Sequence, residues 1–271
     1  MSADGETSPP NGGTAGSAPP VDNARVREAL ERWAGRKDGQ TFADVVRRAV
    51  VGQLLLDITD SRIADPSAGF GPGDTIAITS QNDAAGKHLL VAFTNNDELT
   101  RYRGRPGISL GQPAAAVLAQ AMRDYEGIVI DGRSAGAFIA YSAELEQQLG
   151  GDPEAVRPLT EATVTRAMPF EEFLQALAAG AVYIPFEVRR DENGAEAGIV
   201  VPGAVGADGA PHAVLGTAPA EVWAWSPGSG AQRTGLGNVA RAVLAQGQAG
   251  VVVNPAGPSA VIPADVLRRF A

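Results

Sequence analysis

The sequence contains no cysteine and only two histidines, His88 and His212. Without thiols the chain can form no disulfide, zinc ribbon or thiolate nucleophile, so its stability must come from packing. Two histidines are too few for a histidine-rich metal site, and no EF-hand spacing of acidic residues occurs. We therefore assign no metal ligands and no cofactor.

Positive charge is also scarce. The chain has 22 Lys and Arg residues against 31 Asp and Glu, a formal net charge of −9, and Lys37 and Lys87 are its only lysines. Such a charge repels phosphate backbones and anionic lipids, which argues against nucleic-acid and membrane partners. There is no apolar run of about 18 residues and no basic N-terminal leader before an apolar stretch, so we expect a cytoplasmic protein. Arginine supplies almost all of the positive charge, and alanine, glycine and valine are abundant, a bias that is typical of a GC-rich bacterial genome.

The N-terminal segment differs in composition from the rest of the chain. Residues 1–22 are almost all Ser, Gly, Pro, Ala, Thr, Asp and Glu, a composition that predicts a disordered tail. Val26, Leu30 and Trp33 then recur at i, i+4 and i+7, which predicts an amphipathic helix over residues 23–35.

Two regions of similar length follow this helix. Apolar strands and amphipathic helices alternate over residues 36–149 and again over 159–271. The segment 150–158 has two glycines and two prolines, which is typical of a linker. We therefore expect two α/β domains, each a small mixed sheet with helices packed on it.

The second region repeats the first. Phe42 begins an amphipathic helix that ends before a glycine and an apolar strand, and Phe170 does the same 128 residues later. Residues 116–120 recur letter for letter as 242–246, and the strand at 127–131 recurs as 250–254, at offsets of 126 and 123. A collinear series at a nearly constant offset indicates a tandem duplication, and its period exceeds the roughly 20–50 residues of solenoid repeats.

The repeated residues resemble a known family. Residues 90–99 read LVAFTNNDEL and precede a helix and the strand GIVID, while residues 250–259 of the second copy read GVVVNPAGPS. These runs resemble the SseB-type domain, the N-terminal domain of "enhanced serine sensitivity" proteins. The first copy departs from that pattern with Asp131-Gly132 in place of Asn-Pro, and the second with Gly216-Thr217 in place of Phe-Thr. The resemblance implies a mixed α/β fold and no established catalytic activity.

Four titratable residues are candidates for chemistry because they correspond between the copies. His88 and His212 are each the first residue of an apolar strand, a position where histidine is common without a catalytic role. The spacing of the sequence indicates no serine or carboxylate partner for either histidine. Glu98 and Glu221 each lie early in a short helix, where stabilisation of the helix dipole is sufficient to explain a carboxylate. We assign no catalytic residue.

Aromatic residues form the preferred binding surface. Trp223 and Trp225, with Tyr102 at the matching place in the first copy, could anchor a partner, since exposed aromatics are common interface anchors. As neighbours at i and i+2, the tryptophans share a face on a strand but diverge on a helix. The candidate ligand or partner surface is Trp223, Trp225, Tyr102, Glu98 and Glu221.

A glycine-rich segment that resembles a phosphate loop has a simpler interpretation. The run 234–238, TGLGN, precedes a helix but lacks the Lys-Ser/Thr of a P-loop and the glycine spacing of a dinucleotide loop. A turn with Asn238 as the helix N-cap explains it.

Three hypotheses of function follow. The first is a non-enzymatic binding or regulatory module that takes a protein or small ligand in an inter-domain groove or at a sheet edge. The second is an unrecognised hydrolase or transferase that uses carboxylates in that groove, which requires at least two titratable groups in one pocket. The third is a self-associating scaffold that pairs through open strand edges.

Overall fold

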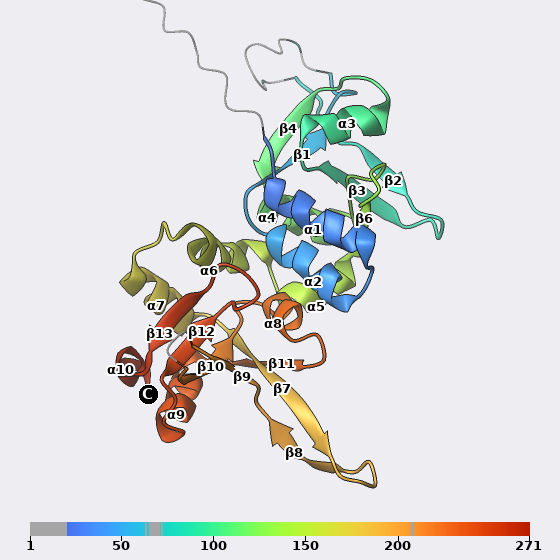
Figure 1. The fold of residues 1–271 in the computed structure, drawn as a ribbon. Coiled ribbons are helices and arrows are strands. Elements are labelled where there is room, and N and C mark those ends of the chain that lie inside the picture. Colours follow the sequence, from blue (N-terminus) through green and yellow to red (C-terminus); the bar gives the residue numbers. More distant parts are fainter. Residues whose placement is uncertain (1–20, 63, 65–70, 72, 207–208) are drawn as a thin grey trace, which may run out of the picture.

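The structure is a computed structural model that describes residues 21–62, 64, 71, 73–206 and 209–271. All but the last two residues of the tail expected at 1–22 lie outside this described part. The chain forms two α/β units in succession, one running from blue to green in the upper part of Figure 1 and one from yellow to red below it. We call them the first copy and the second copy.

The first copy opens with two helices whose starts are set by short polar side chains. Asn23 accepts a hydrogen bond from the backbone amide of Val26, and Asp38 forms a capping box with Thr41. The elements of this copy are α1 (Ala24–Gly35), α2 (Gly39–Arg48), β1 (Gln53–Asp57), β2 (Ser80–Asn82), β3 (His88–Phe93), α3 (Asn96–Arg103), β4 (Ser109–Pro113), α4 (Ala114–Asp124), β5 (Gly127–Ile130), β6 (Phe138–Tyr141) and α5 (Ser142–Leu149).

One mixed sheet organises the first copy, with strand order β4-β1-β3-β5-β6 and β2 beside β3. Only β3 and β5 run parallel. Successive side chains of a strand point to opposite faces, so Leu54 and Leu56 pack with α1, α2, α4 and α5, whereas Leu55 packs with Leu99 of α3. The main core of the copy therefore lies on the four-helix side of the sheet.

The second copy repeats this order of elements with one additional strand before α8 (Pro219–Trp225). They are α6 (Pro153–Thr165), α7 (Phe170–Ala179), β7 (Val182–Arg190), β8 (Glu196–Val200), β9 (Gly203–Val205), β10 (Pro211–Leu215), α8 (Pro219–Trp225), β11 (Gly230–Thr234), α9 (Leu236–Ala245), β12 (Gly250–Val253), β13 (Ala260–Pro263), α10 (Ala264–Leu267) and a 3₁₀ turn, η1 (Arg268–Phe270). The predicted mixed α/β fold and tandem duplication are confirmed.

Strand registers match between the copies. Leu90 faces Ile128 across the parallel pair β3–β5, and Ala213 faces Val251 across the parallel pair β10–β12. The sheet of the second copy is split into β13-β12-β10-β9 and β11-β7-β8. A single antiparallel bridge, Tyr183–Gly216, joins the two parts where the first copy pairs Leu55 with Phe93.

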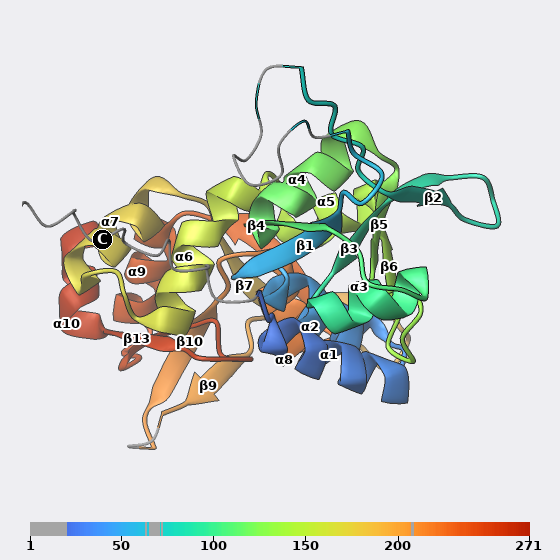
Figure 2. The same cartoon turned by 90° about the horizontal axis from the view of Figure 1, so that it is seen from above.

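The segment expected as a linker, residues 150–158, is helical from Pro153 onward. Helix α6 begins at Pro153, with Asp152 as its N-cap, so the irregular connection after α5 is only three residues long. Helix α6 precedes α7 as α1 precedes α2, and it lies beside α4 of the first copy in Figure 2. Helix α1, expected as a separate N-terminal helix, buries Val26, Ala29 and Leu30 in the core of the first copy.

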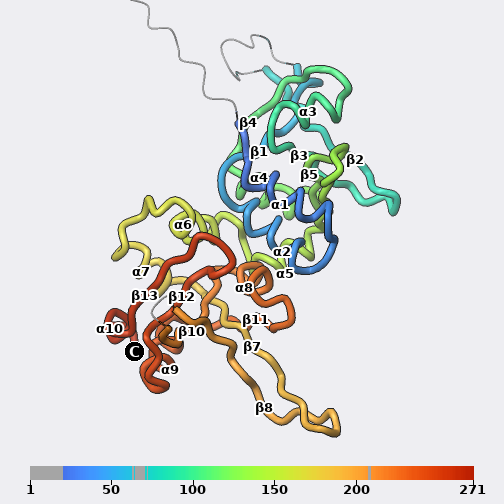
Figure 3. The backbone as a smooth tube through the Cα atoms, viewed as in Figure 1, coloured from blue at the N-terminus to red at the C-terminus, as the bar shows by residue number. Residues whose placement is uncertain are grey.

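The second copy also extends a two-stranded arm. The far half of β7 pairs only with β8, and Figure 3 shows this hairpin projecting away from the rest of the chain. Every residue of β8 is exposed, including Ile199 at 67%.

Candidate functional site

The two copies contact each other through α2 and α8, which lie together at the centre of Figure 1. Ala43 of α2 and Ala220 and Ala224 of α8 form a small buried cluster, with Trp223 and Ala256 at its edge. Small side chains allow two helices to approach closely, but they supply little apolar area. Other interactions must help to fix this interface.

A buried ion pair crosses the same interface. Arg47 of α2 and Glu221 of α8 are 7% and 2% exposed, and Arg47 Nη1 lies 3.6 Å from Glu221 Oε2. Arg47 Nη2 also donates to the carbonyl oxygen of Ala256, at 2.8 Å. A Cβ atom on Gly257 would lie 2.6 Å from Arg47 Nη1, so a larger residue there would displace the end of the Arg47 side chain.

Burial dominates the electrostatics of Glu221. It raises the pKa of this carboxyl group above the usual range, although the charge of Arg47 opposes the shift. Glu221 Oε2 and Arg47 Nε both lack a hydrogen-bond partner in the described part of the chain. The pair therefore holds two charges that are incompletely satisfied, which is costly in a buried place.

A groove of about 480 Å³ opens next to this pair. It is lined by Arg32 of α1, Arg36 of the α1–α2 connection, five residues of α2, and two residues of the second copy, Ala224 and Ala256. The α2 residues are Gln40, Thr41, Asp44, Arg47 and Arg48. We call this opening the arginine groove, because four arginines line it beside one aspartate. Three further acidic side chains pair with these arginines from outside the lining: Asp38 with Arg36, Glu28 with Arg48 and Glu221 with Arg47.

Three of the four arginines share one carboxylate. Asp44 lies 2.6 Å from Arg32 Nη2, 2.6 Å from Arg47 Nη2 and 3.1 Å from Arg48 Nε. Burial alone would raise the pKa of Asp44, but the three guanidinium groups outweigh it and hold that pKa below the usual range. Asp44 is thus ionised at neutral pH and is one of four acidic side chains that pair with the four arginines.

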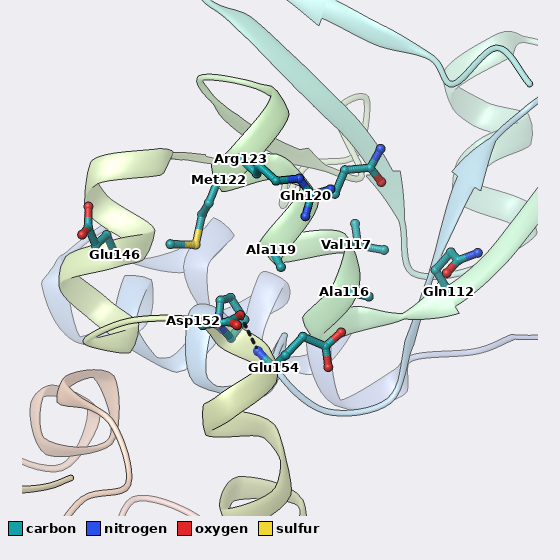
Figure 4. A pocket seen from close by; sticks show the side chains of 11 residues that line it. Gln112, Ala116, Val117, Ala119, Gln120, Met122, Arg123, Glu146, Asp152 and Glu154 are labelled. Carbon is teal, nitrogen blue, oxygen red and sulfur yellow. Dashed lines mark hydrogen bonds between the residues drawn. The ribbon is translucent and has the colours of Figure 1, made fainter. Parts of the chain in front are cut away.

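A second opening between the copies is acidic. It has a volume of about 690 Å³ and lies between α4, α5 and the start of α6, with Glu146, Asp152 and Glu154 in its lining. Figure 4 shows Glu146 apart from the other two carboxylates, and Asp152 accepting a hydrogen bond from the Glu154 amide as the α6 cap. Asp152 therefore serves as the cap of α6, and Glu146 lies apart from it.

The residues that carry the family resemblance have a structural role. Thr94 donates from its amide to Asp131 Oδ1, at 2.9 Å, and from its hydroxyl to Asp131 Oδ2, at 2.7 Å. Thr217 donates from its amide to Asn254 Oδ1 in the same way, at 2.9 Å. Each pair ties together the carboxyl ends of the two parallel strands of its copy.

Comparison with known proteins agrees with the repeat. The family model described as "SseB protein N-terminal domain" matches residues 26–147 and again residues 159–269. The chain belongs to the SseB family. No curated protein and no solved structure matches this SseB-family chain.

The structure separates the residues expected to form one ligand surface. Tyr102 and Glu98 lie on α3, on the side of the first copy away from α8. Tyr102 packs on Phe93 and donates to Gln81, and Glu98 pairs with Arg101 of its own helix. Glu98 is the third residue of α3, as the helix-dipole interpretation expects.

The other three expected residues lie on α8. Because this segment is a helix, Trp223 and Trp225 do not share a face, and Trp223 donates from its ring to the Ser229 carbonyl, at 3.1 Å. Glu221 is buried between the copies, contrary to the expectation of an open surface. The SseB-family chain therefore has no continuous patch made of these five residues.

The histidines stay apart from both grooves. His88 lies within 2.7 Å of the Ser80 hydroxyl and stacks beside Tyr125, while His212 Nδ1 lies 3.0 Å from the carbonyl oxygen of Ala210. Asn238 is not the N-cap expected from the sequence, since α9 begins earlier, after Gly235.

The arginine groove was missed by the sequence analysis. Asp44, Arg47 and Arg48 have the i, i+3 and i+4 spacing of ion pairs on a helix face, which was the only available signal. Their convergence with Arg32 and with the second copy depends on how the copies dock.

Within the described ranges, no cluster of three or more His, Cys, Asp or Glu side chains could hold a metal ion. No helix in that part of the chain has the length and apolar character needed to cross a bilayer. The cytoplasmic location stays a prediction.

Proposed function

We propose that this SseB-family chain is a non-enzymatic binding module whose arginine groove takes an anionic ligand with two or more carboxylate or phosphate groups. The observation that carries the proposal is the sharing of Asp44 by Arg32, Arg47 and Arg48. Guanidinium groups form charge-assisted, bidentate hydrogen bonds with such anions. A ligand would compete with Asp38 for Arg36 and with Glu28 for Arg48.

The geometry of the groove suits a small ligand. Its volume falls within the roughly 300–1,000 Å³ that is usual for small-molecule sites. Arg32 and Arg36 have side chains 45% and 64% exposed and can reorient toward a ligand, whereas Arg47 is held by the second copy. The site combines one guanidinium group held by the second copy with two more exposed ones.

The hydrolase or transferase hypothesis has one observation in its favour. Asp44 and Glu221 both contact Arg47, and their pKa values are shifted in opposite directions, as in many acid–base pairs. However, Glu221 is buried behind Arg47 and does not line the groove, so it cannot reach a bound substrate. We therefore favour binding over catalysis.

A thermal-shift titration with citrate and inorganic pyrophosphate at low ionic strength tests the proposal. At 100 times its Kd a ligand stabilises the folded chain by about 2.7 kcal/mol, a rise in Tm of roughly 5–10 °C. The variant Arg32→Gln/Arg36→Gln should lose most of this rise. Added salt should reduce it in the wild type, because exposed charges are screened.

The matched control is Arg101→Gln/Arg105→Gln, which removes the same charge from exposed positions on and after α3. It should keep the wild-type shift. Equal losses in both variants would show a general charge effect and contradict a groove site. Turnover of either anion that disappears in Asp44→Asn would favour the enzyme hypothesis instead.

A further inference from the structure

A second site follows from a difference between the copies. In the first copy, an aromatic cluster fills the space between α1, α2 and β6. The ring of Trp33 lies 6.0 Å from that of Phe42 and 5.6 Å from that of Phe138, and its Nε1 donates to the Ala137 carbonyl. Phe138 is 1% exposed, so the cluster is well packed.

The second copy keeps only one ring of this cluster. Phe138 faces Ile130 across β5–β6, and the corresponding residue, facing Val253 across β12–β13, is Ala260. Phe170 corresponds to Phe42 and is 43% exposed. Helix α6 carries no aromatic residue in the place of Trp33.

The missing rings leave a cavity. An opening of about 420 Å³, which we call the α6–β13 pocket, is lined by Thr163, Met168, Phe170, Phe173 and Ala260, among others. Its position between α6, α7 and β13 is that of the aromatic cluster in the first copy. Ser259, which corresponds to Ala137, also lines it. The pocket therefore lies where the first copy holds the indole ring of Trp33.

One charged residue stands in the pocket lining. Arg166 follows the last residue of α6 with a left-handed backbone, at φ 54°, and its exposed side chain forms no ion pair with the described residues. No acidic side chain lines the pocket. A ligand that fills the apolar part can thus place a carboxylate beside Arg166 without meeting a repulsive charge.

We propose that the α6–β13 pocket binds a small molecule with one planar aromatic ring and a carboxylate on a short side chain. The ring takes the place of the missing aromatic side chains and stacks with Phe170 and Phe173, and the carboxylate pairs with Arg166. Residues 1–20 contain no Phe, Trp or Tyr, so the N-terminal segment of this chain cannot supply the ring. This site is separate from the arginine groove.

The test is a titration of the full chain with indole-3-propionate, followed by NMR signals from the methyl group of Met168 and the ring of Phe170. Saturable shifts of both residues are expected. Indole should bind more weakly than indole-3-propionate by about tenfold, which is the size of one charge-assisted contact. Arg166→Gln should remove that preference and leave indole binding nearly unchanged.

Ala260→Phe restores the residue of the first copy and should abolish binding, with a Tm equal to or above that of the wild type. If that variant fails to fold, Ala260→Leu fills part of the pocket and should weaken binding by at least tenfold. Ala195→Phe, at an exposed turn, is the size-matched control.

Several results would overturn the proposal. These are the absence of shifts at Met168 and Phe170, binding that persists in folded Ala260 variants, and equal affinity for cyclohexanepropionate. Light scattering could also show a dimer that dissociates when indole-3-propionate is added. That result would mean that the pocket holds part of another molecule of the same chain, and it would overturn the proposal.

Discussion

At the scale of single residues, the two copies provide a natural comparison at one position. Asp131 and Asn254 both follow the second parallel strand with a left-handed backbone, at φ 50° and 54°, and both accept hydrogen bonds from a threonine. Burial raises the pKa of Asp131 from 3.8 to about 6, against the hydrogen bonds from Thr94, while Asn254 carries no charge.

This shift makes the stability of the first copy depend on pH. The folded state binds the Asp131 proton more tightly than the unfolded state does. The protonated carboxyl group therefore makes its full contribution to stability below about pH 4, and this contribution is lost as the pH rises through 6. The ionised group costs up to roughly 3 kcal/mol above that range, at 1.36 kcal/mol per pKa unit.

We therefore predict that Asp131→Asn raises the free energy of unfolding at pH 8 by up to roughly 3 kcal/mol and changes it little at pH 4. The amide can donate to the Thr94 hydroxyl, as Asn254 Nδ2 donates to Thr217. Urea denaturation at both pH values measures the difference from the wild type.

Asn254→Asp is the reciprocal control and should destabilise the chain more at pH 8 than at pH 4. A stability gain in Asp131→Asn that is the same at both pH values would show that packing, and not the buried charge, distinguishes the two residues.

At the scale of elements, strands and helices with strong apolar patterns were predictable. The run 88–94 is almost continuously apolar and forms β3 at the centre of the sheet. Helix α6 was missed because Pro153 and Pro158 follow two glycines, which is a loop composition. Pro153 in fact occupies the first turn, where proline is tolerated, and burial of Leu159 and Thr163 stabilises the rest of the helix.

The candidate site was less predictable than the fold. Glu221 was singled out for its position in a helix, yet its burial results from docking of α8 on α2. Likewise, the α6–β13 pocket exists because Ala260 stands where the first copy has Phe138. Such features depend on which surfaces meet in three dimensions, and local sequence patterns do not encode that.

A glycine at the start of β12 limits what the strand tolerates. A Cβ atom on Gly250 would lie 2.3 Å from the carbonyl oxygen of Ile262 in β13, and the contact is with backbone. We predict that Gly250→Ala lowers the free energy of unfolding by about 3 kcal/mol, because the β12–β13 ladder must shift. Urea denaturation followed by circular dichroism measures it.

Gly35→Ala is the control, since nothing lies within 4 Å of a Cβ atom at that helical position. It should be neutral or stabilising by up to about 1 kcal/mol. If Gly250→Ala stays within about 0.5 kcal/mol of the wild type, the strand pair is more adaptable than its packing indicates.

At the scale of the whole molecule, the relation between the copies depends on the α2–α8 interface and on the α4–α6 contact. The buried residues of the α2–α8 cluster are alanines, and the ion pair Arg47–Glu221 is buried beside them. A buried ion pair adds little net stability, but breaking it leaves an uncompensated charge. The pair is therefore best understood as fixing the docking geometry, which in turn shapes the arginine groove.

We predict that Arg47→Met costs about 3–5 kcal/mol at pH 8, because Glu221 remains buried without its partner. The cost should be smaller at pH 5, since the raised pKa of Glu221 allows it to take up a proton. Arg47→Met/Glu221→Leu should be more stable than Arg47→Met alone, because no buried charge is left unpaired.

Differential scanning calorimetry should show one transition for the wild type and two for Arg47→Met, as the copies lose their coupling. A single, merely lowered transition in Arg47→Met would place the coupling in the alanine cluster and the α4–α6 contact, and the ion pair would then have no role in orienting the copies.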